Sequence, residues 1–115
     1  MKIKVPTEIL VMGKKVSICY KNKLNLDGEY LSGACIADDN LILISLAENQ
    51  TLESIEKTLA HEIFHFVMAK SGLTNLLGDN EEVFTVCVEE NYFPLFKFNR
   101  RLWRKKVEVE IGSKD

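Results

Sequence analysis

A helical period of apolar residues runs through residues 51–72 and contains both histidines of the chain. Thr51 can act as the N-cap, because its side chain accepts a hydrogen bond from the first turn. Gly72 can adopt the left-handed conformation that ends a helix. One apolar stripe recurs at helical spacing, made of Leu52, Ile55, Leu59, Ile63 and Phe66. We therefore predict a single helix over residues 52–71, with this stripe packed on a sheet.

The two histidines lie on the opposite side of this predicted helix. His61 and His65 are four positions apart and so share one face. Their neighbours on that side, Phe64 and Met68, are apolar, as expected of a helix that is covered on both sides. A second element is therefore expected to cover the histidines.

Residues 80–93 are predicted to form that second element, as a helix. Asp79 or Asn80 can cap it, and the acidic residues that follow suit the positive end of a helix dipole. The run VFTVCV, residues 83–88, is rich in β-branched residues and would also fit a buried strand. Pro94 is expected to end or kink the helix.

The N-terminal half has the pattern of two β-hairpins. Residues 8–20 form two β-rich runs broken at Gly13-Lys14, where glycine permits a tight turn. Residues 33–46 repeat this arrangement, with a turn at residues 38–40 and an apolar strand at residues 41–46. We predict an α+β fold, in which a small antiparallel sheet packs on the histidine-bearing helix.

The bulk composition fits one globular domain, residues 1–115. The formal net charge is only −2, which gives no overall attraction for nucleic acid or anionic membranes. The three cysteines form no CxxC pair, and no apolar stretch resembles a signal peptide or a membrane span. A cytoplasmic protein without a membrane association is therefore expected, with Cys87 as a small core residue.

The HEIFH sequence, residues 61–65, has the spacing of a metal chelate. Positions i and i+4 lie one helical turn apart, so the rings of His61 and His65 can bind one ion. Glu62 is rotated by about 100° from His61, beside the ion, where its carboxylate can accept a proton from water. Zinc lowers the pKa of bound water toward about 7, so this arrangement predicts zinc-dependent hydrolysis with Glu62 as the general base.

A catalytic zinc ion takes three protein ligands, and this chain has no third histidine. Met68 and Ser71 occupy the positions that would continue the longer HExxHxxGxxH motif. The third ligand must then be a carboxylate or a cysteine. The nearest candidates are Glu81 and Glu82, of which Glu82 is favoured and Glu81 is the alternative. The more distant candidates are Cys87, Glu89 and Glu90.

The run NLILISLAENQTLESIEKTLAHEIFHFVMAKSGL and the later NEEVFTVCVEENY resemble small phage-encoded zincin-like metallopeptidases. That group is distantly similar to the IrrE/ImmA proteases and to SprT-like domains, and the resemblance covers about residues 5–98. It implies a third ligand at Glu82, or at Glu81 by a shift of one residue. It also implies that the strand at residues 41–46 holds an extended peptide at its edge. By analogy with IrrE/ImmA proteases, the substrate would be a transcriptional regulator.

The sequence departs from this group in two respects. Phe66 and Val67 replace the small residue often found after the second histidine, and residues 99–115 have no counterpart, so they could be an extension. In this tail the alternating KVEVEI fits an edge strand or frayed chain.

A non-catalytic module is the alternative function, in which metal joins two helices and the tail or the sheet edge binds a partner. Nucleic-acid binding through Arg100–Lys106 is less favoured than a solvated basic face.

Overall fold

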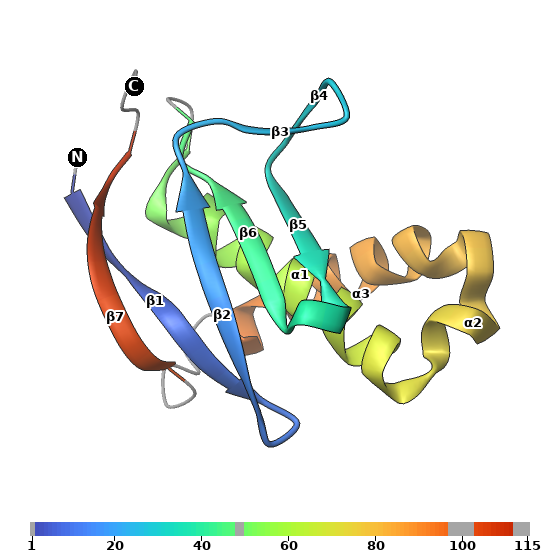
Figure 1. Cartoon of the computed structure of the whole chain (residues 1–115). Helices are drawn as coiled ribbons and strands as arrows, with labels where there is room; N and C mark the ends of the chain where they lie inside the picture. The colour runs from blue at the N-terminus through green and yellow to red at the C-terminus, as the bar shows by residue number, and fades with distance from the viewer. Residues whose placement is uncertain (1, 48–49, 97–102, 112–115) are drawn as a thin grey trace.

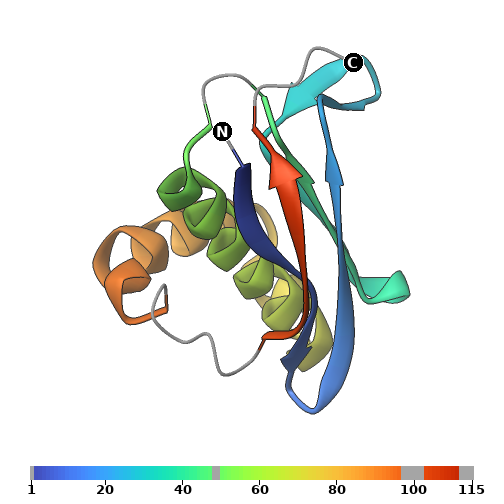
Figure 2. The ribbon, with the colours of Figure 1, turned by 90° about the vertical axis from the view of Figure 1, so that its left-hand side faces the viewer.

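The computed structural model describes the backbone of residues 2–47, 50–96 and 103–111, and the side chains of these residues except 89–96 and 103. It has a mixed α+β architecture, with the helices packed on one face of a sheet (Figures 1 and 2). The strands are β1 (Lys2–Val11), β2 (Lys14–Lys21), β3 (Leu24–Leu26), β4 (Glu29–Leu31), β5 (Gly33–Ile36), β6 (Leu41–Ser45) and β7 (Trp103–Glu110). The α-helices are α1 (Leu52–Ser71), α2 (Leu73–Leu77) and α3 (Glu81–Phe96).

Both predicted hairpins are present. β1 and β2 pair antiparallel around a turn in which Met12 and Gly13 have φ angles of 53° and 74°. Two consecutive positive φ angles give the turn whose twist matches that of the flanking strands. β5 and β6 also pair antiparallel, and the 3-10 turn Ala37–Asp39 connects them.

The main sheet has the order β5-β6-β2-β1-β7, and β3 and β4 form a separate two-stranded sheet. The expectation of a purely antiparallel sheet is wrong for one pair, because β2 and β6 run parallel. The chain leaves β2, forms the β3–β4 hairpin, returns along β5 and only then enters β6. β6 is consequently an interior strand, and β5 lies at the edge of the sheet.

The predicted apolar stripe of α1 faces the sheet. Ile55, Leu59 and Phe66 are buried, and they pack with buried valines and isoleucines of β1, β2 and β6. Leu52 and Ile63 are partly buried against the same cluster. Met68, on the histidine side, is also buried, so α1 is covered on both sides as the sequence predicts.

The ends of α1 coincide with the predicted caps. Thr51 and Ser54 form a reciprocal capping box, in which each side chain accepts a hydrogen bond from the other residue's backbone N–H. Gly72 has a φ angle of 84°, in the left-handed region that glycine adopts readily. Local chemistry alone therefore fixes the length of this helix.

The second predicted helix is also present as α3, which begins after the 3-10 turn Gly78–Asn80. It continues to Phe96, so Pro94 does not end it. Proline has no backbone N–H, so the helix lacks the hydrogen bond from this position to the carbonyl four residues earlier. Cys87 is exposed, so its prediction as a core residue is wrong.

The tail contributes an edge strand to the main sheet. β7 pairs antiparallel with β1, as the alternating sequence indicates. Arg104, Lys105 and Lys106 are exposed on β7, and Lys105 lies 3.6 Å from the Glu8 carboxylate. Charged side chains of this kind discourage pairing with another chain. The rest of the basic cluster, residues 100–102, lies outside the described residues.

Among the described helices, none combines the length and apolar character needed to cross a bilayer.

A partly buried hydrogen bond joins β2 to the part of β1 where the pairing with β7 is irregular. The pairing of β1 with β7 shifts register between Pro6 and Glu8, and the Tyr20 hydroxyl donates a hydrogen bond of 2.6 Å to the Pro6 carbonyl. Burial raises the pKa of Tyr20 well above its ordinary value, so the folded protein favours the neutral phenol.

We predict that Tyr20→Phe lowers the free energy of unfolding by about 0.5–1.5 kcal/mol at neutral pH, because the bond to Pro6 is lost. The pKa of Tyr20 is higher in the folded protein than in the unfolded chain. The stability of the wild type therefore falls as the pH rises above about 10, where Tyr20 ionises in the unfolded chain. This alkaline loss should be smaller in the variant. Denaturant unfolding at several pH values measures both effects, with the exposed Tyr30→Phe as the control. Equal alkaline losses in wild type and Tyr20→Phe would contradict the assignment.

Candidate metal centre

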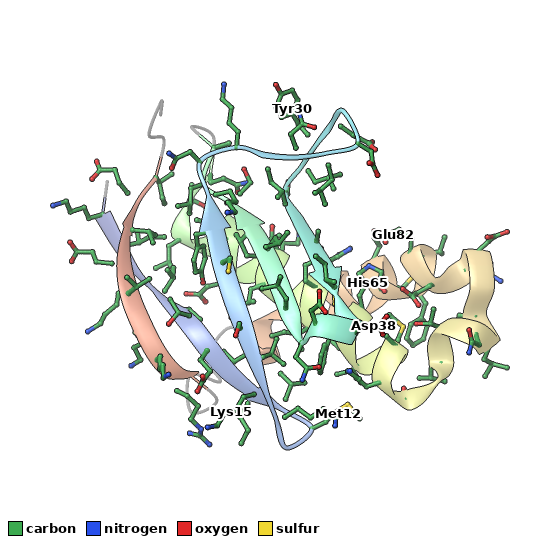
Figure 3. All side chains as sticks on the ribbon, viewed as in Figure 1. Met12, Lys15, Tyr30, Asp38, His65 and Glu82 are labelled. Atoms are coloured by element: carbon green, nitrogen blue, oxygen red, sulfur yellow. The ribbon has the colours of Figure 1, made fainter. Side chains whose placement is uncertain are left out.

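The two histidines of α1 face the first turn of α3. Helical spacing places His61 and His65 on one side of α1, and each side chain is only 17% exposed. α3 begins with Glu81 and Glu82, and Figure 3 shows Glu82 beside His65, next to β5. The packing of α1 against α3 thus brings together two local features: a pair of histidines one helical turn apart and the two glutamates at the start of α3.

The carboxylate of Glu82 meets both imidazoles. Its Oε1 atom lies 3.0 Å from Nε2 of His61, and its Oε2 atom lies 3.0 Å from Nε2 of His65. The two Nε2 atoms are 3.2 Å apart. Potential ligand atoms from three side chains, those of His61, His65 and Glu82, therefore lie close together.

Glu81 contacts the other nitrogen of His65. Its Oε2 atom lies 2.6 Å from Nδ1, close enough for a strong charge-assisted hydrogen bond. The Thr74 hydroxyl and the His65 ring hold the pKa of the Glu81 carboxyl below its usual range, against the opposing effect of burial. The ionised form is therefore favoured, and its contribution to stability is lost as the pH falls through that pKa.

The bond to Glu81 determines the state of His65. An ionised carboxylate only accepts hydrogen bonds, so Nδ1 of His65 must carry the proton. In the neutral ring, Nε2 then presents a lone pair to the Glu82 oxygen at 3.0 Å and to Nε2 of His61 at 3.2 Å. A proton on one of the Nε2 atoms, such as that of His61, makes these contacts hydrogen bonds, and a metal ion among the three groups could equally bind the lone pairs.

The geometry fits a small divalent ion. Two donors bonded at about 2.0–2.1 Å to a tetrahedral zinc ion lie about 3.3–3.4 Å apart, close to the separations found here. One donor atom from each of His61, His65 and Glu82 falls within 4.8 Å of the others. A second carboxylate on the far nitrogen of a ligating histidine, as Glu81 provides, is a common support of such sites. The predicted choice of Glu82 over Glu81 agrees with these positions.

Glu62 lies between the histidines and the sheet. Its side chain is buried, with 7% exposed, and it lines a cavity of about 510 Å³ together with both histidines and Glu82. The remaining lining comes from Thr58 and from residues 31–34. The predicted base and the three predicted ligands therefore adjoin one space that is large enough for part of a peptide.

A close approach of β5 to α1 sets the position of Glu62. A Cβ atom added to Gly33 would lie 2.7 Å from Cγ2 of Thr58 and 3.2 Å from Cγ of Glu62. It would also lie 3.2 Å from the carbonyl oxygen of Leu43 in β6. Only glycine allows the strand and the helix to come so close. Sequence reasoning missed this role, because the contact joins residues far apart in the chain.

Cys35 of β5 is a further neighbour of the site that the sequence does not point to. It lines a second small cavity with Glu62, His65 and Glu81. Burial, together with the negative charges of Glu62 and Glu81, raises the pKa of the Cys35 thiol to about 11. The thiol is therefore protonated at neutral pH. Cys87, the one cysteine predicted as a candidate ligand, is exposed and is not among the three grouped donors.

The strand next to the histidines differs from the predicted one. The edge at residues 41–46 was expected to hold an extended peptide, but β6 pairs on one side with β5 and on the other with β2. β5 takes the edge position instead, and Gly33 and Ala34 line the cavity at the metal centre. β6 is an interior strand because it pairs in parallel with β2 as well as antiparallel with β5.

Comparison with known proteins identifies no relative: no family model, no curated protein and no solved structure matches this chain. Any functional assignment must therefore be argued from the residues and their geometry.

We predict different effects for the two glutamates on zinc affinity. Glu81→Gln should weaken binding about 10- to 100-fold, the usual effect of losing a partner of a ligating histidine. Glu82→Gln should weaken binding more, because a metal ligand is lost. Competition with a chromophoric chelator measures both affinities, with the exposed Glu53→Gln on the first turn of α1 as the control. A larger loss for Glu81→Gln would reverse the assigned roles.

We predict that Gly33→Ala destabilises the protein by about 1–3 kcal/mol, because the new methyl group overpacks the contact with α1. Thr58→Ser removes the methyl group at 2.7 Å, so the double variant should recover part of the loss. Denaturant unfolding of the two single variants and the double variant gives the coupling free energy. Strictly additive effects would show that the two residues do not touch.

Proposed function

We propose that this protein is a zinc-dependent peptidase with a zincin-like site, in which His61, His65 and Glu82 bind zinc and Glu62 is the general base. The observation that carries the proposal is the Glu82 carboxylate, whose two oxygens each lie 3.0 Å from an Nε2 atom of the HEIFH histidines. A chance HExxH sequence in a core helix would not require a carboxylate at this point. The sequence motif and the tertiary contact support the same site independently.

The donor set supports a catalytic ion over a purely structural one. Structural zinc sites are closed by four protein ligands, whereas catalytic sites use three and leave one position for water or substrate. Among the described residues, three side chains form the cluster, and the 510 Å³ cavity adjoins all of them. Mixed nitrogen and oxygen donors at short separations suit zinc.

Glu62 would carry out the proton transfers. Bound zinc supplies a Lewis acid that lowers the pKa of a water ligand and polarises the peptide carbonyl. Glu62 accepts a proton as the water oxygen attacks the carbonyl carbon. It then delivers that proton to the amide nitrogen as the carbon–nitrogen bond breaks. Its burial beside Gly33 keeps the carboxylate in one position for both steps.

An extended peptide is the substrate that the neighbouring strand suits. β5 is an edge strand, and its backbone N–H and C=O groups on the side away from β6 can pair with a peptide added to the sheet. Such a peptide would pass the cavity at Gly33 and Ala34. By analogy with the IrrE/ImmA proteases alone, we propose a regulatory protein as the natural substrate.

We predict that Glu62→Gln retains zinc but lowers the rate of peptide hydrolysis about 10²- to 10⁴-fold, the usual contribution of a general base. Metal analysis of purified protein and cleavage of unfolded casein by zinc-loaded protein test the two statements separately. Glu53→Gln, an exposed glutamate on the same helix, should leave both properties unchanged.

Two results would contradict this prediction. Equal activity of wild type and Glu62→Gln would remove Glu62 from the mechanism. Stoichiometric zinc without hydrolysis in the wild type would favour the alternative module, in which the ion only joins α1 to α3.

A further inference from the structure

A third cavity lies beside β4 and adjoins the cavity that contains the histidines. It has a volume of about 360 Å³ and shares Leu31 and Ser32 with the cavity that contains the histidines. We call it the Lys23 cavity. Its other walls include Lys23, Tyr30, Ser45 and Gln50. Figure 3 shows β5 running from the hairpin that carries Tyr30 toward His65 and Glu82.

The spacing allows one substrate to occupy both cavities. A strand advances about 3.2–3.4 Å per residue, and Leu31 is only two positions from Gly33. A peptide paired with the edge of β5, with its cleaved bond near Gly33, would therefore place a residue one to three positions away beside Leu31 and Ser32. The side chain of that residue would enter the Lys23 cavity.

The charges that line the two cavities differ. Glu62 and Glu82 line the cavity that contains the histidines, where the charge of a bound zinc ion would offset these two carboxylates. Lys23 is the single charged residue among the described residues that line the Lys23 cavity. An acidic side chain is thus attracted to the Lys23 cavity, which would fix the register of the peptide.

Hydrogen-bond donors in the Lys23 cavity also suit a carboxylate. Oε1 of Gln50 accepts a hydrogen bond of 2.6 Å from the Ser54 hydroxyl, which leaves the amide NH₂ group of Gln50 as a donor. Tyr30, Ser32 and Ser45 add hydroxyl groups. Leu31, which is partly buried, gives an apolar wall for the methylene groups of a glutamate or aspartate side chain.

We propose that the Lys23 cavity is a specificity subsite that binds the carboxylate of a glutamate or aspartate residue in the substrate, at a fixed position from the cleaved bond. This inference rests on the proposed peptidase function. It adds the class of sequence that the enzyme cleaves and names Lys23 as the residue that selects it.

A degenerate peptide library tests the subsite. Zinc-loaded wild type should yield cleavage sites that are enriched in glutamate or aspartate at one position relative to the bond. Lys23→Glu should lose this enrichment and favour lysine or arginine there. For a peptide with the acidic residue, we expect kcat/KM to fall about 2- to 5-fold in Lys23→Glu, in the range of exposed ion pairs. The matched control is Lys21→Glu, an exposed lysine of β2 that does not line the cavity.

The outcomes separate the subsite from the peptidase function. If the wild type cleaves without an acidic preference, the subsite is overturned but the peptidase function is not. The same holds if Lys23→Glu keeps the acidic preference of the wild type, as Lys21→Glu is expected to do. Absence of any cleavage beyond that of Glu62→Gln would overturn the peptidase function and, with it, a subsite for cleavage.

A binding measurement tests the subsite without hydrolysis. Zinc-loaded Glu62→Gln is titrated with a short alanine peptide that carries a central glutamate, and with its glutamine counterpart, while backbone amide NMR shifts are recorded. The glutamate peptide should shift Ser32 and Ser45 at lower concentrations than the glutamine peptide, and Lys23→Glu should abolish the difference. Equal titrations of the two peptides would overturn the proposal.

Discussion

The carboxylate of Glu82 faces two imidazole nitrogens at 3.0 Å, and those nitrogens face each other at 3.2 Å. These distances suit hydrogen bonds through a proton on one Nε2 atom, and they equally suit a bound metal ion. Because Glu81 holds the proton of His65 on the other ring nitrogen, the lone pair of His65 is directed into the cluster. The junction of α1 and α3 thus brings together a group that could hold a metal ion, and the proposed function depends on it.

A second constraint is the contact of α1 with the edge of the sheet. Gly33 lets β5 lie against Thr58 and Glu62 with no room for a methyl group. This contact brings the backbone of an edge strand and a buried carboxylate to the same cavity as His61, His65 and Glu82. The strand is β5, while Glu62 and both histidines lie on α1 and Glu82 lies on α3. The proposed peptidase function therefore requires three elements to hold their groups in position.

The sequence predicted the local features well. Thr51, Gly72 and the apolar stripe defined α1 because caps and helical periodicity act within a few residues. The two hairpins and the β7 edge strand followed from turn residues and alternation. The burial of Cys87, the purely antiparallel sheet and the edge position of residues 41–46 were predicted wrongly, because burial and strand pairing depend on segments that are distant in the chain. Of the two predicted effects of Pro94, ending the helix is wrong, because α3 continues to Phe96.

The sequence by itself determined that two histidines lie one turn apart on a covered face of a helix, with a glutamate beside them. That result needs only the 3.6-residue repeat and the capping chemistry of residues 51–72. Only the tertiary structure decided which glutamate of α3 reaches both imidazoles, and that β5 is the edge strand beside them. Neighbouring glutamates are equivalent in sequence, but on a helix they are rotated by about 100°. The packing of α1 against α3 therefore places Glu82 against both Nε2 atoms and Glu81 against Nδ1 of His65.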